Sequence, residues 1–323
     1  MEFNYPPQAD AYRAKVKEFL KANLPAGWKG IGALSRDEAF EFTNNWRKTL
    51  FENGFLAVQW PKEYGGQGLS SLEMVVLTEE FFKAGVPTGG HNDGFGIAML
   101  GNTLLAVGTE EQKKYYLPRI LAGEDLWCQG YSEPAAGSDL GNLGCRAVLD
   151  GDEWVINGQK IWTTGGHHAD HIFVLARTSP DDVKHKGITF LLVDMRQKGV
   201  EVRPIRMMSG ESEFNEVFFT DARCPKENVV GEVNGGWMVA MTLLGNERGA
   251  GAAINALSFR EELNKLHEMV KERGLTDDPQ IRQRLAKAHT KVELMRFLGY
   301  RALTAFLNGK KPGPDASIGK LFW

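Results

Sequence analysis

The stretch Cys145–Trp162, CRAVLDGDEWVINGQKIW, marks the change in pattern that decides the fold. Apolar and polar side chains alternate along it, which is the signature of half-buried β-strands. It contains two dipeptides, Asp150-Gly151 and Asn157-Gly158, that are strong signals for tight hairpin turns. Asparagine, aspartate and glycine tolerate the positive φ angles of such turns. The stretch therefore predicts strands that reverse at both dipeptides.

Further strand patterns follow this stretch, and helical patterns lie on both sides of it. Strands are expected over residues 171–179, 187–195, 200–205 and 215–224, which are rich in β-branched and aromatic residues. Near the N-terminus, Tyr12, Val16, Phe19 and Leu20 form an apolar stripe at helical spacing, and residues 89–96 (GGHNDGFG) are expected to be a break. Three capping boxes predict further helix starts: Ser35 with Glu38, Ser70 with Glu73, and Thr109 with Gln112.

The order helix, sheet, helix predicts an α+β multidomain protein. We expect an N-terminal all-α domain over residues 1–125, a central β-barrel over 126–232 and a C-terminal helical bundle over 233–323. Residues 317–323 (SIGKLFW) have the pattern of an apolar helix that has just begun. From this we expect the bundle to be incomplete in this chain, which is either a fragment or part of a longer natural protein.

Composition excludes several classes of protein. The chain has 323 residues and a net charge of −3, so no basic excess indicates nucleic-acid binding. No apolar run approaches the ~18 residues of a membrane span, and the first residues lack the apolar core of a signal peptide. The three cysteines are widely spaced. This usage favours reduced thiols in a cytoplasmic protein without a membrane partner.

Three familiar site patterns are incomplete. Gly249-Ala250-Gly251 lacks the third glycine and the preceding strand of a dinucleotide fingerprint, so close helix packing explains it better. No G-x-S-x-G motif indicates a serine nucleophile. The histidines at positions 167, 168 and 171 lead into a strand and have no supporting cysteine or carboxylate cluster. No metal site is therefore expected.

Two polar segments could hold a flat ligand. QGYSEPAAGSDL, residues 129–140, offers backbone N–H groups and hydroxyls, although a long linker between domains would look the same. KIWTTGG, residues 160–166, ends a strand, and alternation places Trp162 and Thr164 on one face. An indole beside a hydroxyl suits stacking on a ring and hydrogen bonding to its edge. Taken alone, the segment favours a barrel strand with a core tryptophan.

A single carboxylate occupies an apolar region near the C-terminal helices. Between Val233 and Phe259 the only charged residues are Glu247 and Arg248. At helical spacing Glu247 shares a face with Leu243 and Leu244. A carboxylate surrounded by apolar groups has a raised pKa, as a general base requires. The alternative is a surface glutamate paired with the solvated Arg248.

These segments together resemble the flavin-dependent acyl-CoA dehydrogenase family. The resemblance is carried, in family order, by PKEYGG, GTEEQKKYYLPRILAGE, YSEPAAGSDL, WTTGG, VFFTDARCPKENVVGE and GNERG. It is closest to the members with the catalytic glutamate directly before the arginine on the first helix of the C-terminal domain. The fold that it implies is the helical domain, β-barrel and helical bundle expected above.

The resemblance also implies a cofactor and its site. FAD would bind to the loop that includes Gln129, Tyr131, Ser132 and Ser138, with Trp162 packed on the isoalloxazine and Thr164 near N5. Ser138 and Arg248 would lie on the acyl-CoA side, and Arg273 would contact the FAD diphosphate. Residues 94–99 would line the acyl pocket. Glu247 would be the catalytic base.

The implied reaction forms a 2,3-unsaturated acyl-CoA, by removal of the α-proton and transfer of a hydride to flavin N5. The base position suggests branched, cyclic or steroid-derived acyl chains. Expected partners are the acyl-CoA, an electron-transferring flavoprotein, and other subunits in a homotetramer or a heterotetramer. Two alternatives remain: a half-site or non-catalytic subunit of a heteromeric enzyme, and an oxygen-using acyl-CoA oxidase relative.

Overall fold

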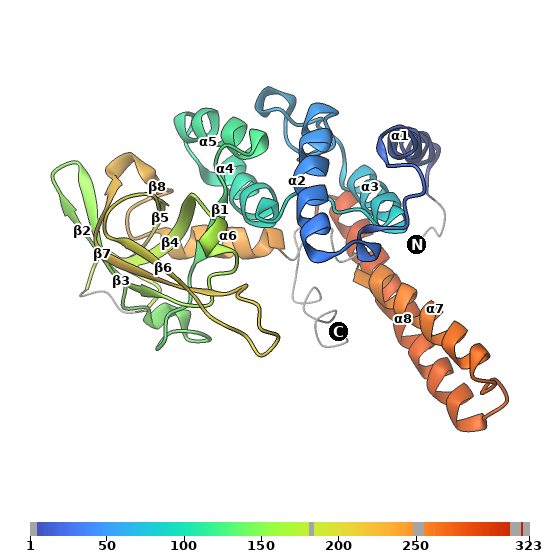
Figure 1. Ribbon diagram of the computed structural model, residues 1–323. Coiled ribbons are helices and arrows are strands. Elements are labelled where there is room, and N and C mark those ends of the chain that lie inside the picture. Colours follow the sequence, from blue (N-terminus) through green and yellow to red (C-terminus); the bar gives the residue numbers. More distant parts are fainter. Residues whose placement is uncertain (1–4, 181–183, 248–254, 311–317, 319–323) are drawn as a thin grey trace. The chain divides into compact units, whose positions relative to one another are not determined.

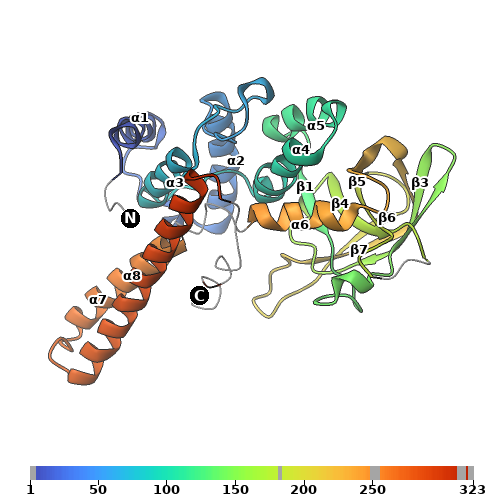
Figure 2. The same ribbon diagram turned by 180° about the vertical axis from the view of Figure 1, so that it is seen from behind.

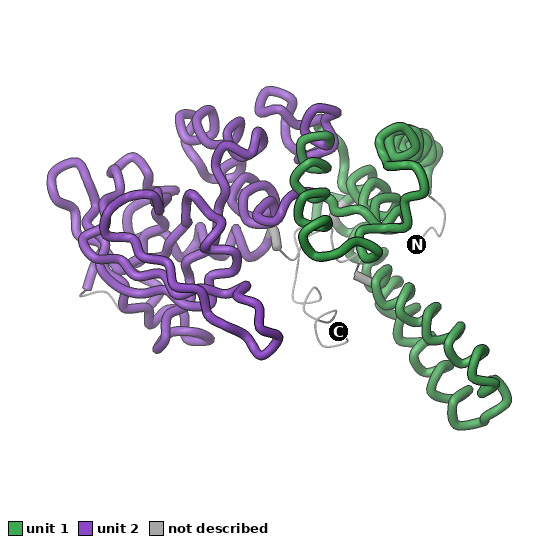
Figure 3. Tube along the Cα trace, viewed as in Figure 1, with its two compact units in different colours: residues 1–49, 68–88, 248–323 green, residues 50–67, 89–247 purple. Residues whose placement is uncertain are grey.

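The computed structural model describes residues 5–180, 184–247, 255–310 and 318. The chain groups into two compact units (Figure 3). Unit 1 comprises residues 1–49, 68–88 and 248–323, and unit 2 comprises residues 50–67 and 89–247. Within the described ranges, no helix has both the length and the apolar character needed to cross a membrane.

Helices and strands follow the order expected from the sequence (Figure 1). The α-helices are α1 (Pro7–Asn23), α2 (Arg36–Glu52), α3 (Ser71–Ala84), α4 (Asn102–Val107), α5 (Glu110–Ala122), α6 (Gly236–Glu247), α7 (Asn255–Glu272) and α8 (Pro279–Leu307). The strands are β1 (Trp127–Gly130), β2 (Arg146–Asp150), β3 (Glu153–Lys160), β4 (His171–Arg177), β5 (Ile188–Asp194), β6 (Val200–Pro204), β7 (Asn215–Pro225) and β8 (Val229–Val230). The predicted order of a helical part, a sheet and a second helical part is confirmed.

The predicted capping boxes begin three helices. The Ser70 hydroxyl accepts from the backbone N–H of Glu73, whose carboxylate accepts from the Ser70 N–H at 2.8 Å, and α3 starts there. Thr109 and Gln112 make the same reciprocal pair at the start of α5. At the start of α2 the Ser35 backbone N–H donates to Glu38 at 2.8 Å. Each box satisfies N–H groups that a helix start leaves unpaired.

Unit 1 is built on the apolar stripe of α1. Phe19 on that stripe contacts the rings of Trp46 and Phe81, with centroids 5.5 and 6.3 Å apart. Tyr12, Val16 and Leu20 are buried beside it, as predicted. Helices α7 and α8 run side by side as an antiparallel pair (Figure 1 and Figure 2).

Unit 2 contains an eight-stranded sheet in the order β6-β7-β3-β2-β4-β5-β8, and β1 pairs with β4 in parallel. The sheet curls strongly. Three strands separate β7 from β5 in this order, yet the Cys224 thiol on β7 donates to the Leu192 carbonyl on β5 at 3.2 Å. The inward residues of the strands therefore gather into one core, which includes Trp154, Ile172 and Phe219. Short β1 and β8 were not expected from the sequence.

Only one of the two predicted hairpin turns forms. Strands β2 and β3 pair up to Asp150 and Glu153, and Gly151 has a φ of 62° in the turn between them. The Asn157-Gly158 prediction is wrong, because both residues lie inside β3 at a break in its register with β7. Gly158 has a φ of 150°, and a Cβ there would lie 2.7 Å from the Cys145 Cα. Glycine is needed there for this φ and for the close approach, whereas the extra residue of the bulge lies in β7, where residues 220 and 221 face Asn157.

Helix α6 packs on the outside of the sheet against β4 and β5. Helix α4 and a π-helix, Gly94–Gly101, pack in turn against α6. Strands β4 and β5 are buried almost throughout, which agrees with a sheet covered on both faces. A Cβ at Gly236 would lie 2.4 Å from the Phe190 nitrogen, so only glycine allows α6 to begin this close to β5. The π-helix includes residues 94–96, so the predicted break over 89–96 is wrong for that part.

Candidate active site

The turn after β3 presents an exposed aromatic ring. Trp162 is 57% exposed and has a φ of 61°, a left-handed conformation that is rare for a bulky residue. Its ring meets Phe214 edge-on at 6.0 Å. Thr163 is buried, whereas Thr164 is half-buried in the turn that follows. A strained backbone conformation costs free energy, and such residues cluster at functional sites.

The polar loop after β1 lies next to this turn. Ser132 accepts a hydrogen bond at its carbonyl from the Ile161 N–H, at 2.9 Å. Tyr131 is buried, and its ring meets Phe173 edge-on at 6.0 Å. Gln129 is half-buried in β1, and Ser138 is exposed further along the loop. The structure thus brings Ser132 against the residue that precedes Trp162.

A buried ion pair ties the loop to the strand. The Lys160 side chain is fully buried, and its ammonium donates to the Glu133 carboxylate at 2.7 Å and to the Tyr131 carbonyl at 3.1 Å. Glu133 also accepts from the backbone N–H groups of Gly144 and Cys145. Our sequence reasoning missed this pair. Strand alternation could have revealed it, because Lys160 lies an even number of residues from Trp154 and Ile156 and so points to the same buried face of β3.

Two buried asparagines, also missed from the sequence, hold the turn. Asn215, at the start of β7, donates from its side chain to the Thr163 carbonyl at 2.8 Å. Asn92, just before the π-helix, donates to the Trp127 carbonyl at 2.9 Å and to the Gly165 carbonyl at 3.4 Å. No local sequence pattern marks these residues, because their partners are distant in the chain.

The predicted base, Glu247, and Arg273 lie on elements other than this turn and loop. Glu247 is the last residue of α6, one helical turn after the buried Leu243. Arg248 lies outside the described residues. Arg273 is exposed in the turn after α7 and belongs to unit 1, where its N–H donates to the Met269 carbonyl. The roles of these three residues stay predictions.

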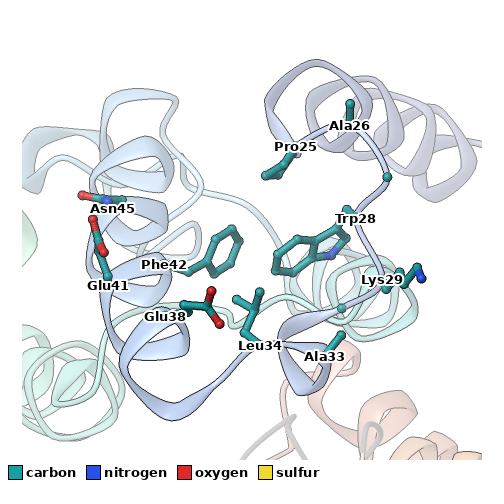
Figure 4. Close-up of a pocket in the computed structure, with 12 residues that line it drawn as sticks. Pro25, Ala26, Trp28, Lys29, Ala33, Leu34, Glu38, Glu41, Phe42 and Asn45 are labelled. Atoms are coloured by element: carbon teal, nitrogen blue, oxygen red, sulfur yellow. The ribbon is translucent and has the colours of Figure 1, made fainter.

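One described cavity lies elsewhere. It has a volume of about 480 Å³ and lies in unit 1, between residues 25–34 and α2 (Figure 4). Trp28 and Phe42 stack there with centroids 4.4 Å apart. Of its carboxylates, Glu38 is engaged by Ser35 at the start of α2. None of the predicted site residues lines this cavity, so we do not assign the chemistry to it.

The surroundings of His167, His171 and Cys145 indicate roles in packing and hydrogen bonding rather than in metal binding or nucleophilic catalysis. His167 hydrogen bonds to Asn215, and His171 is buried against the Trp127 ring. The part of the chain that the structure describes contains no cluster of three or more potential metal ligands. Burial raises the pKa of the Cys145 thiol to about 11, so this thiol is a poor nucleophile at neutral pH.

Comparisons with known proteins agree on one family. The chain matches the acyl-CoA dehydrogenase N-terminal domain over residues 6–124, the middle domain over 128–222 and the C-terminal domain over 234–323. It is 43% identical to acyl-CoA dehydrogenase IpdE1 of Mycobacterium tuberculosis, over 97% of this chain and 82% of that protein.

Two solved structures are also similar. One, described as the Tcur3481-Tcur3483 steroid ACAD, has a TM-score of 0.84 and 36% identity, over 100% of this chain and 82% of that one. The ChsE4-ChsE5 complex from Mycobacterium tuberculosis has a TM-score of 0.79 and 34% identity, over 100% and 82%. The chain therefore belongs to the acyl-CoA dehydrogenase family, whose members are FAD-dependent oxidoreductases.

Proposed function

We propose that this chain oxidises an acyl-CoA thioester to its 2,3-unsaturated form, with Glu247 as the base. The observation that carries the proposal is the strained, exposed Trp162 beside the polar loop that begins after β1. It is joined by the family membership and by a lone carboxylate at the end of α6. Each feature has a role in this reaction.

The residues around Trp162 fit a flavin. An indole that is more than half exposed loses free energy in water, and a flat ring stacked on it would recover that loss. The Thr163 hydroxyl is buried and has no hydrogen-bond partner within the described residues. The turn therefore still has a hydroxyl that can donate or accept a hydrogen bond. Gln129, Tyr131, Ser132, Ser138 and Thr164 would hold the FAD with Trp162, and Arg273 would hold its diphosphate. When bound, FAD supplies the hydride acceptor at N5.

Glu247 would remove the proton from the carbon next to the thioester. A carboxylate becomes a stronger base when water is excluded, because burial disfavours its charged form. On α6, the helix that Glu247 ends, Val239, Ala240 and Leu243 are buried. Ser138 and Arg248 would bind on the acyl-CoA side.

The acyl group would be branched, cyclic or steroid-derived. One similar solved structure is a steroid ACAD, and a 32% identical relative is a cyclohexane-1-carbonyl-CoA dehydrogenase from Geobacter metallireducens. The π-helix Gly94–Gly101 would line the acyl pocket. Its exposed positions include Gly94 and Ala98, which leave space for a bulky group. The electron acceptor would be an electron-transferring flavoprotein.

A bleaching assay tests this proposal. The purified protein is loaded with FAD and titrated without oxygen with straight-chain, branched, cyclic and steroid-derived acyl-CoA thioesters. Loss of the flavin absorbance near 450 nm, with an unsaturated product, is expected for at least one bulky thioester. If the protein holds FAD but no thioester bleaches it, the proposed reaction is wrong.

A second candidate is a subunit that contributes to a site shared with an unlike partner. The observation that favours it is that one similar solved structure is the ChsE4-ChsE5 complex and that the description of another joins two protein names, Tcur3481 and Tcur3483. Such a subunit would hold FAD only when mixed with its partner, which size-exclusion chromatography with flavin detection would reveal.

A third candidate, an oxidase, would produce hydrogen peroxide during aerobic turnover, whereas a dehydrogenase would depend on the flavoprotein acceptor.

A further inference from the structure

The left-handed conformation of Trp162 needs an explanation. The φ of 61° is disfavoured for any residue with a Cβ, and more so for a bulky one. A chain segment that is free to relax would return to negative φ. The conformation persists only where neighbouring groups fix the backbone on both sides.

On the N-terminal side the backbone is fixed by the polar loop. The N–H of Ile161 donates to the Ser132 carbonyl at 2.9 Å. The residue before it, Lys160, is held through its buried ammonium by Glu133. The chain therefore enters Trp162 in a fixed position.

On the C-terminal side Asn215 holds Thr163, the residue that follows Trp162. Asn215 is fully buried, and its side-chain N–H donates to the Thr163 carbonyl at 2.8 Å. Its own backbone carbonyl accepts from the Thr163 N–H at 3.0 Å. The side-chain oxygen is engaged in turn by the His167 ring, at 3.1 Å. Both polar backbone groups of Thr163 are thus bonded to Asn215.

The geometry points to a positioning role: we propose that Asn215 keeps Trp162 in its left-handed, exposed conformation by holding Thr163. The side-chain bond to the Thr163 carbonyl fixes the peptide that follows Thr163, and the backbone bond fixes the one before it. Without the side chain, Trp162 relaxes and its indole turns away from the surface that it presents. This inference rests on the proposed function, because it takes the presented surface to be the one on which FAD stacks.

The test compares FAD binding to the apoprotein and its variants. Asn215→Ala removes the side-chain bond, and Asn215→Asp removes the donor while it keeps the size. Asn228→Ala is the matched control, because Asn228 also lies in unit 2 and bonds a distant carbonyl, that of Leu192 at 3.1 Å. The readouts are the FAD dissociation constant, the visible circular dichroism of bound flavin and the urea midpoint of the apoprotein.

Both Asn215 variants are expected to weaken FAD binding about tenfold, which is the scale of one lost buried hydrogen bond. They should also change the visible circular dichroism. Asn228→Ala should change the dissociation constant less than about twofold, even if its urea midpoint falls as far. In the Trp162→Ala background, Asn215→Ala should leave the FAD dissociation constant almost unchanged, because Asn215 acts on FAD binding through the Trp162 indole.

Two results would overturn the positioning role alone: wild-type FAD binding by both Asn215 variants, or an undiminished effect of Asn215→Ala in the Trp162→Ala background. The second result would make Asn215 a purely structural residue. If the wild-type protein binds no FAD, the proposed function and this role both fall, so the two failures are distinguishable.

Discussion

At the scale of single residues, Glu247 carries the proposed proton transfer. Glu247→Gln keeps the size and hydrogen-bonding capacity of the side chain but removes its basicity. Turnover is expected to fall about 10²–10⁴-fold, with FAD content and melting temperature unchanged. Glu232→Gln is the control, because Glu232 is exposed just before α6. Near-normal turnover of purified Glu247→Gln would show that another group acts as the base.

Replacement by alanine is expected to lower FAD affinity at Trp162 and stability at Trp154. Trp162→Ala removes an exposed ring, so the urea midpoint should change little while FAD affinity falls. Trp154→Ala removes a ring that is buried in the core of the sheet and should cost about 3–5 kcal/mol of stability. Urea unfolding and FAD titration of both variants separate the two effects. If Trp162→Ala unfolds as easily as Trp154→Ala, Trp162 is a core residue.

The sequence singled out Trp162 and Thr164, but the alternation that was to place them on one strand face does not reach them, because β3 ends at Lys160 and Trp162 has a left-handed φ. It did not predict Asn215, which contacts Thr163 across 52 positions of sequence. A long-range contact of this kind is decided by how the sheet folds back on itself. The Trp162 backbone conformation was also missed, since nothing in the side-chain pattern indicates it.

At the scale of elements, the tie between the polar loop and β3 depends on Lys160 and Glu133. Lys160→Met should cost about 3–5 kcal/mol, because it leaves a buried carboxylate without its cation. Lys160→Met with Glu133→Gln should cost less than Lys160→Met alone, since the buried charge is then gone. The measurement is urea unfolding of the single and double variants. A double variant that is less stable than Lys160→Met would contradict a charge-based tie.

Element boundaries were predicted best where capping chemistry marks them, as at Ser70 and Thr109. The Asn157-Gly158 error has a different origin. A hairpin turn and a close backbone approach inside a strand both select glycine, so the dipeptide alone cannot distinguish them. The pairing of β3 with β7, which continues on both sides of Gly158, shows that the dipeptide lies inside a strand.

At the scale of the whole molecule, the order of helices and strands followed from composition and periodicity, since each part has its own repeat of apolar residues. A β-barrel was expected, but the contacts that curl the sheet, such as that between Cys224 and Leu192, did not follow, because they join residues distant in the sequence. Buried titratable groups in such a core make the stability of the fold depend on pH. His171, the first residue of β4, is the clearest example.

His171 is buried against the Trp127 ring at 4.8 Å, and its Nδ1 lies 3.7 Å from Asp125. Burial lowers the pKa of His171 more than the nearby carboxylates Asp125 and Asp194 raise it. The unfolded chain, with a histidine pKa of about 6.5, then binds more protons than the folded chain just below that pH. Stability from this group is therefore complete above pH ~6.5 and is lost as the pH falls towards the folded pKa.

The expected slope is at most about 1.4 kcal/mol per pH unit for one histidine. Partial burial also lowers the pKa of His168, so its contribution has the same sign. Urea unfolding between roughly pH 5 and 7.5 measures the slope for wild type and for His171→Gln, which cannot titrate there. The variant is expected to be less stable at high pH, because it loses the ring contact with Trp127, but to have the flatter profile. Parallel profiles for the two proteins would mean that the pKa of His171 is the same in the folded and unfolded states, and that the acid sensitivity of the fold arises elsewhere.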